Sequence, residues 1–193
     1  MKTKGLALIM LVVLAMSATA QESEKRFGFE LNGGPSFPTN KFVDGLKVGF
    51  GFEGTFHYRF MSHVGVYAGW GANWLSTETS LSNDNLDYEE TGYVFGLSFN
   101  HPIGVTKLAY YLRAGALYNH IEIENNDGEI ISDSGHGIGY QLAGGIDINL
   151  GRNWSLTPGL KFNTLSRDNE IEGVSKHINY QYISARIGIV KKF

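Results

Sequence analysis

The sequence predicts an all-β protein, an eight-stranded antiparallel up-and-down transmembrane β-barrel. Three observations indicate this fold class. An export leader opens the chain, apolar residues alternate with small or polar ones through eight segments, and short connections alternate with long ones. Such a chain is exported and then crosses a membrane with paired strands instead of helices.

Residues 1–20 have the three parts of a secretory signal peptide. Lys2 and Lys4 form a basic start, residues 5–16 are apolar, and small residues at Ala18 and Ala20 mark a cleavage point. This apolar run is too short to span a bilayer as a helix, which takes about 20 residues. We therefore expect residues 1–20 to be a cleaved signal peptide and residues 21–193 to form one outer-membrane β-barrel domain.

Composition argues against several other classes of protein. The chain has no Cys, so we expect neither disulfides nor a lipoprotein anchor. A formal net charge of −3 and an isoelectric point of about 6.1 give no electrostatic argument for a nucleic acid partner. No second apolar run reaches helix-spanning length, so entry into a membrane would require a closed barrel, in which all backbone groups pair between strands.

The alternation is clearest in residues 46–60, where large apolar residues alternate with small or polar ones. Successive side chains of a strand point to opposite faces, so one face of this segment is aromatic and the other is small or polar. The same pattern predicts seven more strands. They are residues 26–34, 64–75, 91–100, 108–121, 137–150, 154–164 and 182–193.

The connections between these segments alternate in length. Short ones are residues 61–63, 101–107 and 151–153, and long polar ones are residues 35–45, 76–90, 122–136 and 165–177. Eight antiparallel strands need three short turns and four long loops if both chain ends lie on the turn side, and outer-membrane barrels have this asymmetry. Pro158 interrupts a predicted strand. Because proline removes a ladder hydrogen bond, we expect a β-bulge there.

Alternation alone does not identify the outer face, because soluble ligand-binding barrels also have eight up-and-down strands. Here glycine dominates the polar face, whereas a solvated exterior is usually about a quarter to a third charged. The interior of an eight-stranded barrel is just wide enough for side chains. Aromatic residues lie toward both strand ends on the apolar face, as in the two girdles of a membrane barrel. The polar face is therefore expected inside and the apolar face in lipid.

The last predicted strand carries alternating apolar residues and ends on an aromatic one, with Ile187, Ile189 and Phe193. With this ending the chain resembles the small outer-membrane barrels of the OmpA/OmpX type, in particular the porin-family outer-membrane β-barrel domain. The resemblance spans the predicted mature chain. Lys191 departs from the pattern, and at the membrane edge its side chain can extend into water.

This resemblance implies an outer-membrane location in a Gram-negative bacterium, with both termini in the periplasm. It implies contact with outer-membrane lipid and lipopolysaccharide. It also implies that Ile187, Ile189 and Phe193 belong to the signal read by the barrel-assembly machinery during insertion. A pattern of this kind specifies a fold far better than it specifies an activity.

Long polar residues of the inward face form the first candidate site, a lumen polar network. They are Glu30, Glu53, Arg113, Gln141, Asp147, Lys161 and Arg186, with Lys47 and Arg59 nearer the ends. Unpaired charges in a narrow barrel would be costly, so we expect opposite charges to pair across the lumen and plug it. The alternative is an ion-conducting path, for which eight strands leave little space.

Acidic residues gather in or beside the predicted long loops. They are Asp44, Glu78, Asp84, Asp87, Glu89, Glu90, Glu122, Glu124, Asp127, Glu129, Asp133, Asp168, Glu170 and Glu172. Such a rim could hold divalent cations, meet the cationic bridges of surface glycolipid or recognise a basic extracellular partner. No dedicated calcium-binding loop occurs, so we favour a solvated surface.

His120, His136 and His177 lie near predicted loop ends, and three imidazoles could form a metal site. Their spacing matches no metal-binding motif, so we expect no metal ion. Some eight-stranded outer-membrane barrels acylate or deacylate lipid A with a His, a Ser and an acid near the outer rim. Two groups here could be assigned to such a scheme: Ser132, Ser134 and His136 with Asp133, or His120 with Glu122. Proximity in sequence does not define that geometry.

Together these patterns predict a non-enzymatic outer-membrane barrel, monomeric and without a cofactor. It would contribute to envelope integrity or surface interaction through its acidic loops. The alternatives are a small-solute or ion pore, a lipid A-modifying enzyme and a soluble ligand-binding barrel.

Overall fold

The computed structural model describes residues 25–39, 47–76, 87–125, 127, 129–171 and 174–193. These residues form nine strands: β1 (Phe27–Pro38), β2 (Gly49–Arg59), β3 (Val64–Ser76), β4 (Asp87–Pro102), β5 (Leu108–Glu124), β6 (Ile130–Asp133), β7 (Gly137–Gly151), β8 (Trp154–Ile171) and β9 (Val174–Lys192). In the described part of the chain, no helix is both long enough and apolar enough to cross a membrane.

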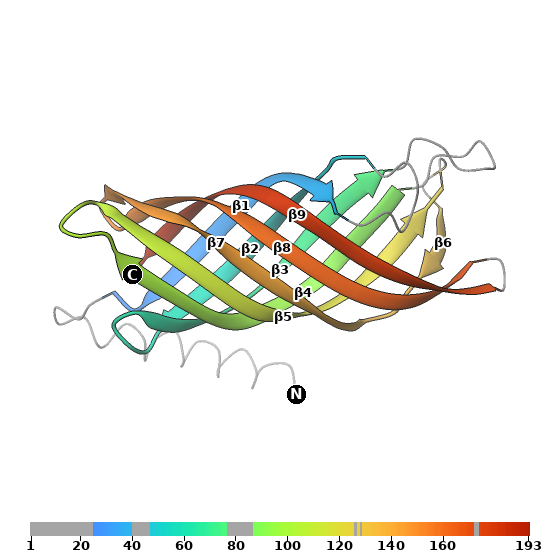
Figure 1. Cartoon of the computed structure of the whole chain (residues 1–193), viewed down its shortest axis with the longest axis horizontal. Coiled ribbons are helices and arrows are strands. Elements are labelled where there is room, and N and C mark those ends of the chain that lie inside the picture. Colours follow the sequence, from blue (N-terminus) through green and yellow to red (C-terminus); the bar gives the residue numbers. More distant parts are fainter. Residues whose placement is uncertain (1–24, 40–46, 77–86, 126, 128, 172–173) are drawn as a thin grey trace, which may run out of the picture.

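Eight of the strands close into an antiparallel barrel, which confirms the predicted fold. Each barrel strand pairs with its neighbours in the chain, apart from the small interruption by β6, and β1 pairs with β9 to close the sheet. Figure 1 shows the strands tilted around one long barrel. The predicted signal peptide lies outside the described residues.

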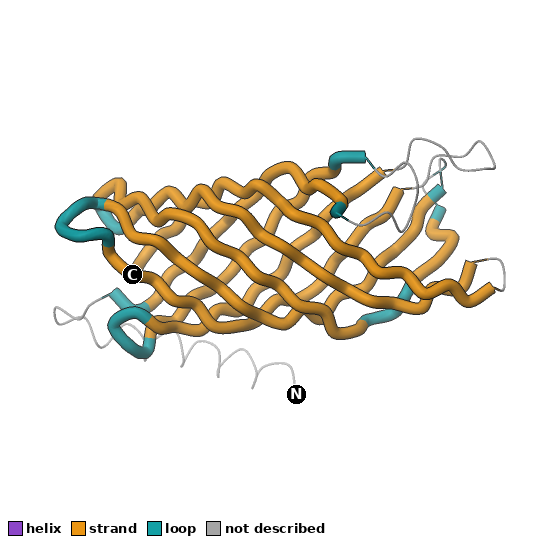
Figure 2. The backbone as a smooth tube through the Cα atoms, in the orientation of Figure 1, coloured by secondary structure: helices purple, strands orange, loops and turns teal. Residues whose placement is uncertain are grey.

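The two ends of the barrel differ. At the turn end, on the left of Figures 1 and 2, short connections join β2 to β3, β4 to β5 and β7 to β8, and the chain ends there. The turn between β7 and β8 places Gly151, Arg152 and Asn153 at φ angles of 85°, 50° and 69°. Tight hairpins use such left-handed residues because their twist matches that of the strands. The opposite end is called the loop end.

Strands reach further toward the loop end than predicted, and this corrects all four predicted long loops. β1 continues to Pro38, β4 begins at Asp87, β8 continues to Ile171, and β9 begins at Val174. The short strand β6 pairs with the end of β5 and continues the wall in the place of β7. Backbone pairing does not require an apolar outer face, so a strand can continue above the lipid after the apolar alternation has ended.

Pro158 does not form the predicted bulge. On one side Gly145 and Ile148 of β7 pair with Gly159 and Leu156, so no extra residue is inserted between them. On the other side the register with β9 runs unbroken through Pro158. Proline here removes one N–H donor from the strand ladder without adding a residue. The register shift between β7 and β8 lies elsewhere, near the turn, between Asn149 and Gly151.

The apolar face points outward, as predicted. Tyr140 is 66% exposed and Ile187 is 65% exposed, whereas their inward neighbours Gln141 and Arg186 are buried. Trp70, Tyr93 and Tyr118 lie side by side on β3, β4 and β5 and form part of the aromatic belt toward the loop end. An exterior this apolar is that of a barrel surrounded by lipid.

Glycine on the inward face makes room for large side chains of nearby strands. A Cβ atom added at Gly145 would lie 2.8 Å from the hydroxyl of Tyr111, and one added at Gly159 would meet the same hydroxyl. Likewise, a Cβ atom at Gly115 would meet the hydroxyl of Tyr67. The glycines of the inward face therefore leave the space that the inward tyrosine side chains occupy.

Candidate functional site in the barrel lumen

The centre of the lumen holds a network of predicted residues around Glu53 of β2. Lys161 of β8 donates to Oε2 of Glu53 at 2.9 Å, and the amide nitrogen of Gln141 donates to the same oxygen at 2.8 Å. The hydroxyl of Tyr67 donates to the amide oxygen of Gln141 at 3.1 Å. All four side chains are buried, and they join strands from opposite walls of the barrel.

A second ion pair joins Arg113 of β5 to Glu30 of β1. Nε2 of His57 lies 3.3 Å from Oε2 of Glu30, the same oxygen that Arg113 contacts. The guanidinium group lies over the ring of Tyr111, 4.7 Å from its centroid, and 5.7 Å from the centroid of Tyr67. Ring faces attract cations, so the two tyrosines hold the guanidinium in place.

The remaining predicted lumen residues lie outside these two pairs. Arg186 is buried, yet among the described residues its Nη2 atom donates only to neutral groups at 3.3–3.5 Å, the hydroxyls of Ser36 and Ser184 and the amide oxygen of Asn73. The structure therefore corrects the expectation that Arg186 pairs with a carboxylate. Asp147 lies at the turn end, where Lys192 donates to it at 2.8 Å.

Of the two end residues, Arg59 lies at the turn end, where its Nη2 atom donates to the carbonyl of Lys25 at 3.3 Å. Lys47 precedes β2 at the loop end, and its backbone N–H donates to the carbonyl of Ser76 at 2.8 Å. Neither residue belongs to the central network.

A third buried network surrounds Glu90 of β4, and it was not predicted from the sequence. Glu90 is 2% exposed, and it accepts hydrogen bonds from the hydroxyl of Tyr182 at 2.7 Å and from the amide of Asn119 at 2.6 Å. The sequence interpretation placed Glu90 in an acidic loop, which the structure corrects. The available signal was the inward series Glu90, Gly92 and Val94, which continues the alternation of the strand.

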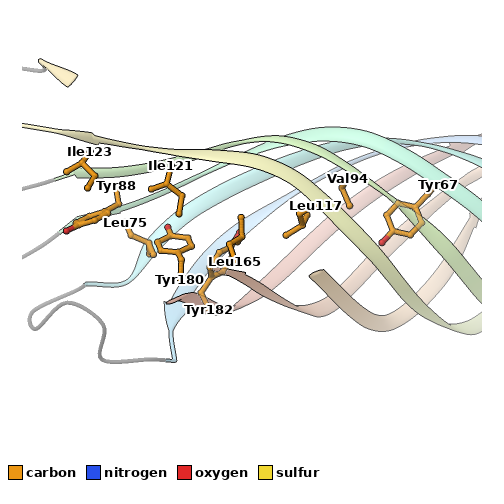
Figure 3. Close-up of a cluster of buried hydrophobic side chains, with 10 residues drawn as sticks. All are labelled: Tyr67, Leu75, Tyr88, Val94, Leu117, Ile121, Ile123, Leu165, Tyr180 and Tyr182. Atoms are coloured by element: carbon orange, nitrogen blue, oxygen red, sulfur yellow. The ribbon is translucent and has the colours of Figure 1, made fainter. Parts of the chain in front are cut away.

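Toward the loop end the lumen is filled with apolar and aromatic side chains, none of which was predicted. Figure 3 shows this apolar layer close to the loop end, with Val94, Leu117 and Tyr67 further along the barrel. Its members are Leu75, Tyr88, Ile121, Ile123, Leu165 and Tyr180. Each is at most 3% exposed, so the layer is tightly packed.

The empty space in the lumen is unevenly distributed. A cavity of about 290 Å³ opens at the turn end, and Arg113 and Glu30 are among its lining residues. Two small spaces of about 10 Å³ each lie deeper, beside Glu53 and Lys161. Such a space holds at most about one water molecule.

The outer wall near the loop end carries a ladder of carboxylates. Directly opposed pairs are Asp87 with Glu124, Glu89 with Glu122, and Glu122 with Asp133. Carboxylate oxygens of Glu89, Glu122 and Glu124 all lie within 4.8 Å of one another. Like charges directly opposite each other on a sheet are destabilising, so this acidic ladder stores repulsion that a cation would relieve.

His120 of β5 stands at the edge of the acidic ladder. Its Nδ1 atom lies 3.4 Å from Asp133 and 3.5 Å from Glu122, and its Nε2 atom lies 2.6 Å from the hydroxyl of Thr91. Its ring stacks on that of His136 with centroids 4.5 Å apart. Of the three predicted imidazoles, two are thus brought together, and the side chain of the third, His177, lies outside the described residues.

Ser134, one of the predicted catalytic candidates, has a structural role. Its hydroxyl accepts a hydrogen bond from the backbone N–H of Ile121 at 2.9 Å and donates to the carbonyl of Gly135 at 3.0 Å. Ser132 is buried on β6. The hydroxyl beside His120 is that of Thr91, on the neighbouring strand.

Comparison with known families decides what kind of barrel this is. The family model of the outer membrane protein beta-barrel domain matches residues 6–189. The chain belongs to this family. Its lipid-exposed apolar face and closed sheet agree with that membership, and the family places the protein in the outer membrane.

Solved structures of small outer-membrane barrels have the same fold. Neisserial surface protein A is 16% identical, with a TM-score of 0.65 over 86% of this chain and 97% of that one. OprG of Pseudomonas aeruginosa is 14% identical (TM-score 0.56, 89% and 98%). Ail, the attachment invasion locus protein of Yersinia pestis, is 15% identical (TM-score 0.55, 89% and 100%). The curated proteins contain no match to the chain.

The C-terminal end of the chain lies at the seam, where β9 pairs with β1 and closes the barrel. Phe193 exchanges backbone hydrogen bonds with Phe27 at 2.9 and 3.1 Å. Ile187 and Ile189 face outward from β9, as does Phe193. Lys191, which departs from the expected pattern, lies 4.7 Å from the ring centroid of Trp154 and donates to the carbonyl of Arg152.

Proposed function

We propose that this chain is a non-enzymatic outer-membrane barrel with a plugged lumen, acting as a monomer at the cell envelope. The observation that supports the plug is the succession of barriers along the lumen. Two ion pairs cross the centre, and the apolar layer fills the loop end. A path for ions would need continuous water, for which the two spaces of about 10 Å³ leave no room.

Conductance in planar bilayers tests this proposal against the pore alternative. The purified barrel should insert without opening a steady channel, while a wide porin in the same bilayer conducts. A stable, ohmic conductance that scales with the amount of inserted protein would instead favour the small-solute or ion pore.

The orientation belongs to the same proposal. The turn end would face the periplasm and the loop end the cell exterior, because outer-membrane barrels have short periplasmic turns and long outer loops. Insertion would depend on the barrel-assembly machinery reading Ile187, Ile189 and Phe193. Protease added to intact cells should then cut the loop end and leave an epitope placed after Phe193 protected.

The acidic ladder supports a role at the outer surface. Its opposed carboxylates would recruit divalent cations, which also bridge the anionic groups of lipopolysaccharide. The fold neighbour Ail is named as an attachment invasion locus protein, and a comparable surface interaction with a basic or cation-bridged partner is proposed here. Binding of the barrel to lipopolysaccharide should accordingly fall when divalent cations are chelated.

One arrangement of side chains favours a second candidate function, that of a lipid A-modifying enzyme. The hydroxyl of Thr91, the imidazole of His120 and the carboxylate of Asp133 lie in series on the outer wall, in the order of nucleophile, base and orienting acid. Mass spectra of lipid A decide the matter. Spectra that are the same with and without the protein remove this candidate, and a change that disappears with His120→Gln supports it.

A further inference from the structure

The cavity at the turn end is a blind pocket. Its inner wall is formed by Glu30, Tyr111 and Arg113, which also line one of the two small spaces behind it. Tyr111 and Val190, whose side chains point inward, give it apolar surface. A volume of about 290 Å³ is close to the lower limit of small-molecule pockets, about 300–1,000 Å³.

The pocket is lined by more cations than anions. Its lining residues include five cationic ones, Lys25, Arg26, Arg59, Arg113 and Lys192, and two carboxylates, Glu30 and Asp147. Each carboxylate is already engaged by a cation of the pocket, Glu30 by Arg113 and Asp147 by Lys192. Lys25 and Arg26 therefore add positive charge at the mouth, and a cleft lined by one sign of charge concentrates ions of the other sign.

Arg113 lies at the inner wall of the pocket, and its side chain is 9% exposed. Its Nε atom is buried without a hydrogen-bond acceptor among the described residues, so a ligand would meet the exposed part of the guanidinium group. The contacts with Glu30 and with the tyrosine rings fix the guanidinium before any ligand arrives.

We propose that this pocket binds a small organic anion, a carboxylate or phosphate carried on a flat apolar body. The cations at the mouth would attract the charge, Arg113 would donate to it, and Tyr111 and Val190 would pack on the body. This goes beyond the proposed function, which concerns the closed lumen and the outer surface. Conductance does not report on a blind pocket, so each proposal can fail without the other.

Titrations followed by fluorine NMR test the charge preference on the full folded barrel in uncharged detergent micelles. The probes are 4-fluorobenzoate and its cationic counterpart of similar shape, 4-fluorobenzylamine. The benzoate should bind at least about tenfold more tightly than the amine, because the net positive lining attracts one and repels the other. Equal binding of the two probes, or no benzoate binding at a probe concentration of about 10 mM, would overturn the proposal.

A pair of charge-matched variants locates the site. Lys25→Gln with Arg26→Gln removes two cations from the mouth, whereas Lys107→Gln with Arg152→Gln removes two cations of the turns outside the pocket. The first variant should weaken benzoate binding at least about threefold, and the second should leave it within about 1.5-fold of wild type. An equal loss in both variants would mean a general attraction to this end of the barrel and would overturn the assignment.

The anion could be a dissolved molecule or the headgroup phosphate of a membrane lipid, and the bilayer distinguishes the two sources. The same titration is run in nanodiscs of phosphatidylcholine and of phosphatidylglycerol. If the anionic lipid competes with the benzoate, the site takes a lipid phosphate; if both lipids give the same affinity, it takes a dissolved anion. Either result supports an anion site, and loss of the benzoate preference in both nanodiscs overturns it.

Discussion

Arg113 joins the lumen network to the wall of the turn-end pocket. Its replacement by Ala leaves Glu30 buried without its cation, and breaking a buried pair costs about 3–5 kcal/mol. We expect Arg113→Ala to lower the free energy of unfolding by that amount, measured by urea unfolding in lipid vesicles followed through tryptophan fluorescence. Lys107→Ala is the control, with a change under about 0.5 kcal/mol.

The paired variant Arg113→Met with Glu30→Gln should be more stable than Arg113→Met alone, because it removes the stranded charge as well. If Arg113→Ala were as stable as wild type while conductance rose, the side chain would gate a path instead of holding the lumen together.

Gly159 tests the packing between glycine and tyrosine. A Cβ atom there would meet the hydroxyl of Tyr111 and lie 2.7 Å from the carbonyl of Gly144, so Gly159→Ala should destabilise the barrel by about 1–3 kcal/mol. Gly33→Ala is the matched control, because its Cβ would have ordinary contacts of 3.4–3.7 Å. Equal unfolding free energies for the two variants would show that the lumen can relax around Tyr111.

At the level of elements, the acidic ladder on β4, β5 and β6 predicts an unusual gain. Glu89→Gln removes one of two directly opposed carboxylates and should raise the free energy of unfolding by about 0.2–1 kcal/mol in a buffer with chelator. The gain should shrink when Mg²⁺ is added, because the cation already relieves the repulsion in wild type. Glu129→Gln, which removes an exposed charge outside the ladder, should change little. A Glu89→Gln barrel less stable in chelator would show that the ladder is not repulsive.

Strand existence could be predicted from sequence, but strand length could not. Within the lipid an apolar outer face is needed, so the alternation marks β2 or β7 clearly. Where a strand continues above the lipid, both faces can be polar, so the backbone pairing leaves little periodic signal. Glu90 was missed because its outward neighbour Glu89 is also polar, although Gly92 and Val94 continue the inward series of Glu90.

The sequence also did not reveal which inward side chains contact each other in the lumen. The inward position of Glu53 and Lys161 follows from alternation, but their pairing depends on the shear of the barrel, which sets which inward residues are level with each other. Arg186 contacts hydroxyl and amide groups, so the presence of opposite charges on the inward face does not by itself identify which residues pair. The apolar layer was also missed, because an inward Leu or Ile looks like an irregularity in the alternation.

At the level of the whole molecule, closure of the sheet predicts resistance to detergent. Each of the eight barrel strands has two neighbours, so the barrel itself has no free edge at which unfolding could begin. The unboiled protein should migrate faster than the boiled protein on a detergent gel and should fractionate with membranes. Recovery as a soluble periplasmic protein with a single gel mobility would contradict the lipid-embedded barrel.

The seam between β1 and β9 also has a consequence for biogenesis. Leu31 pairs with Ile189, so the contact that closes the cylinder joins the two most distant strands of the fold. Until β9 has been delivered, both β1 and β8 present unpaired backbone that lipid cannot satisfy. We therefore expect membrane entry to be a late event that waits for β9, the eighth strand of the barrel.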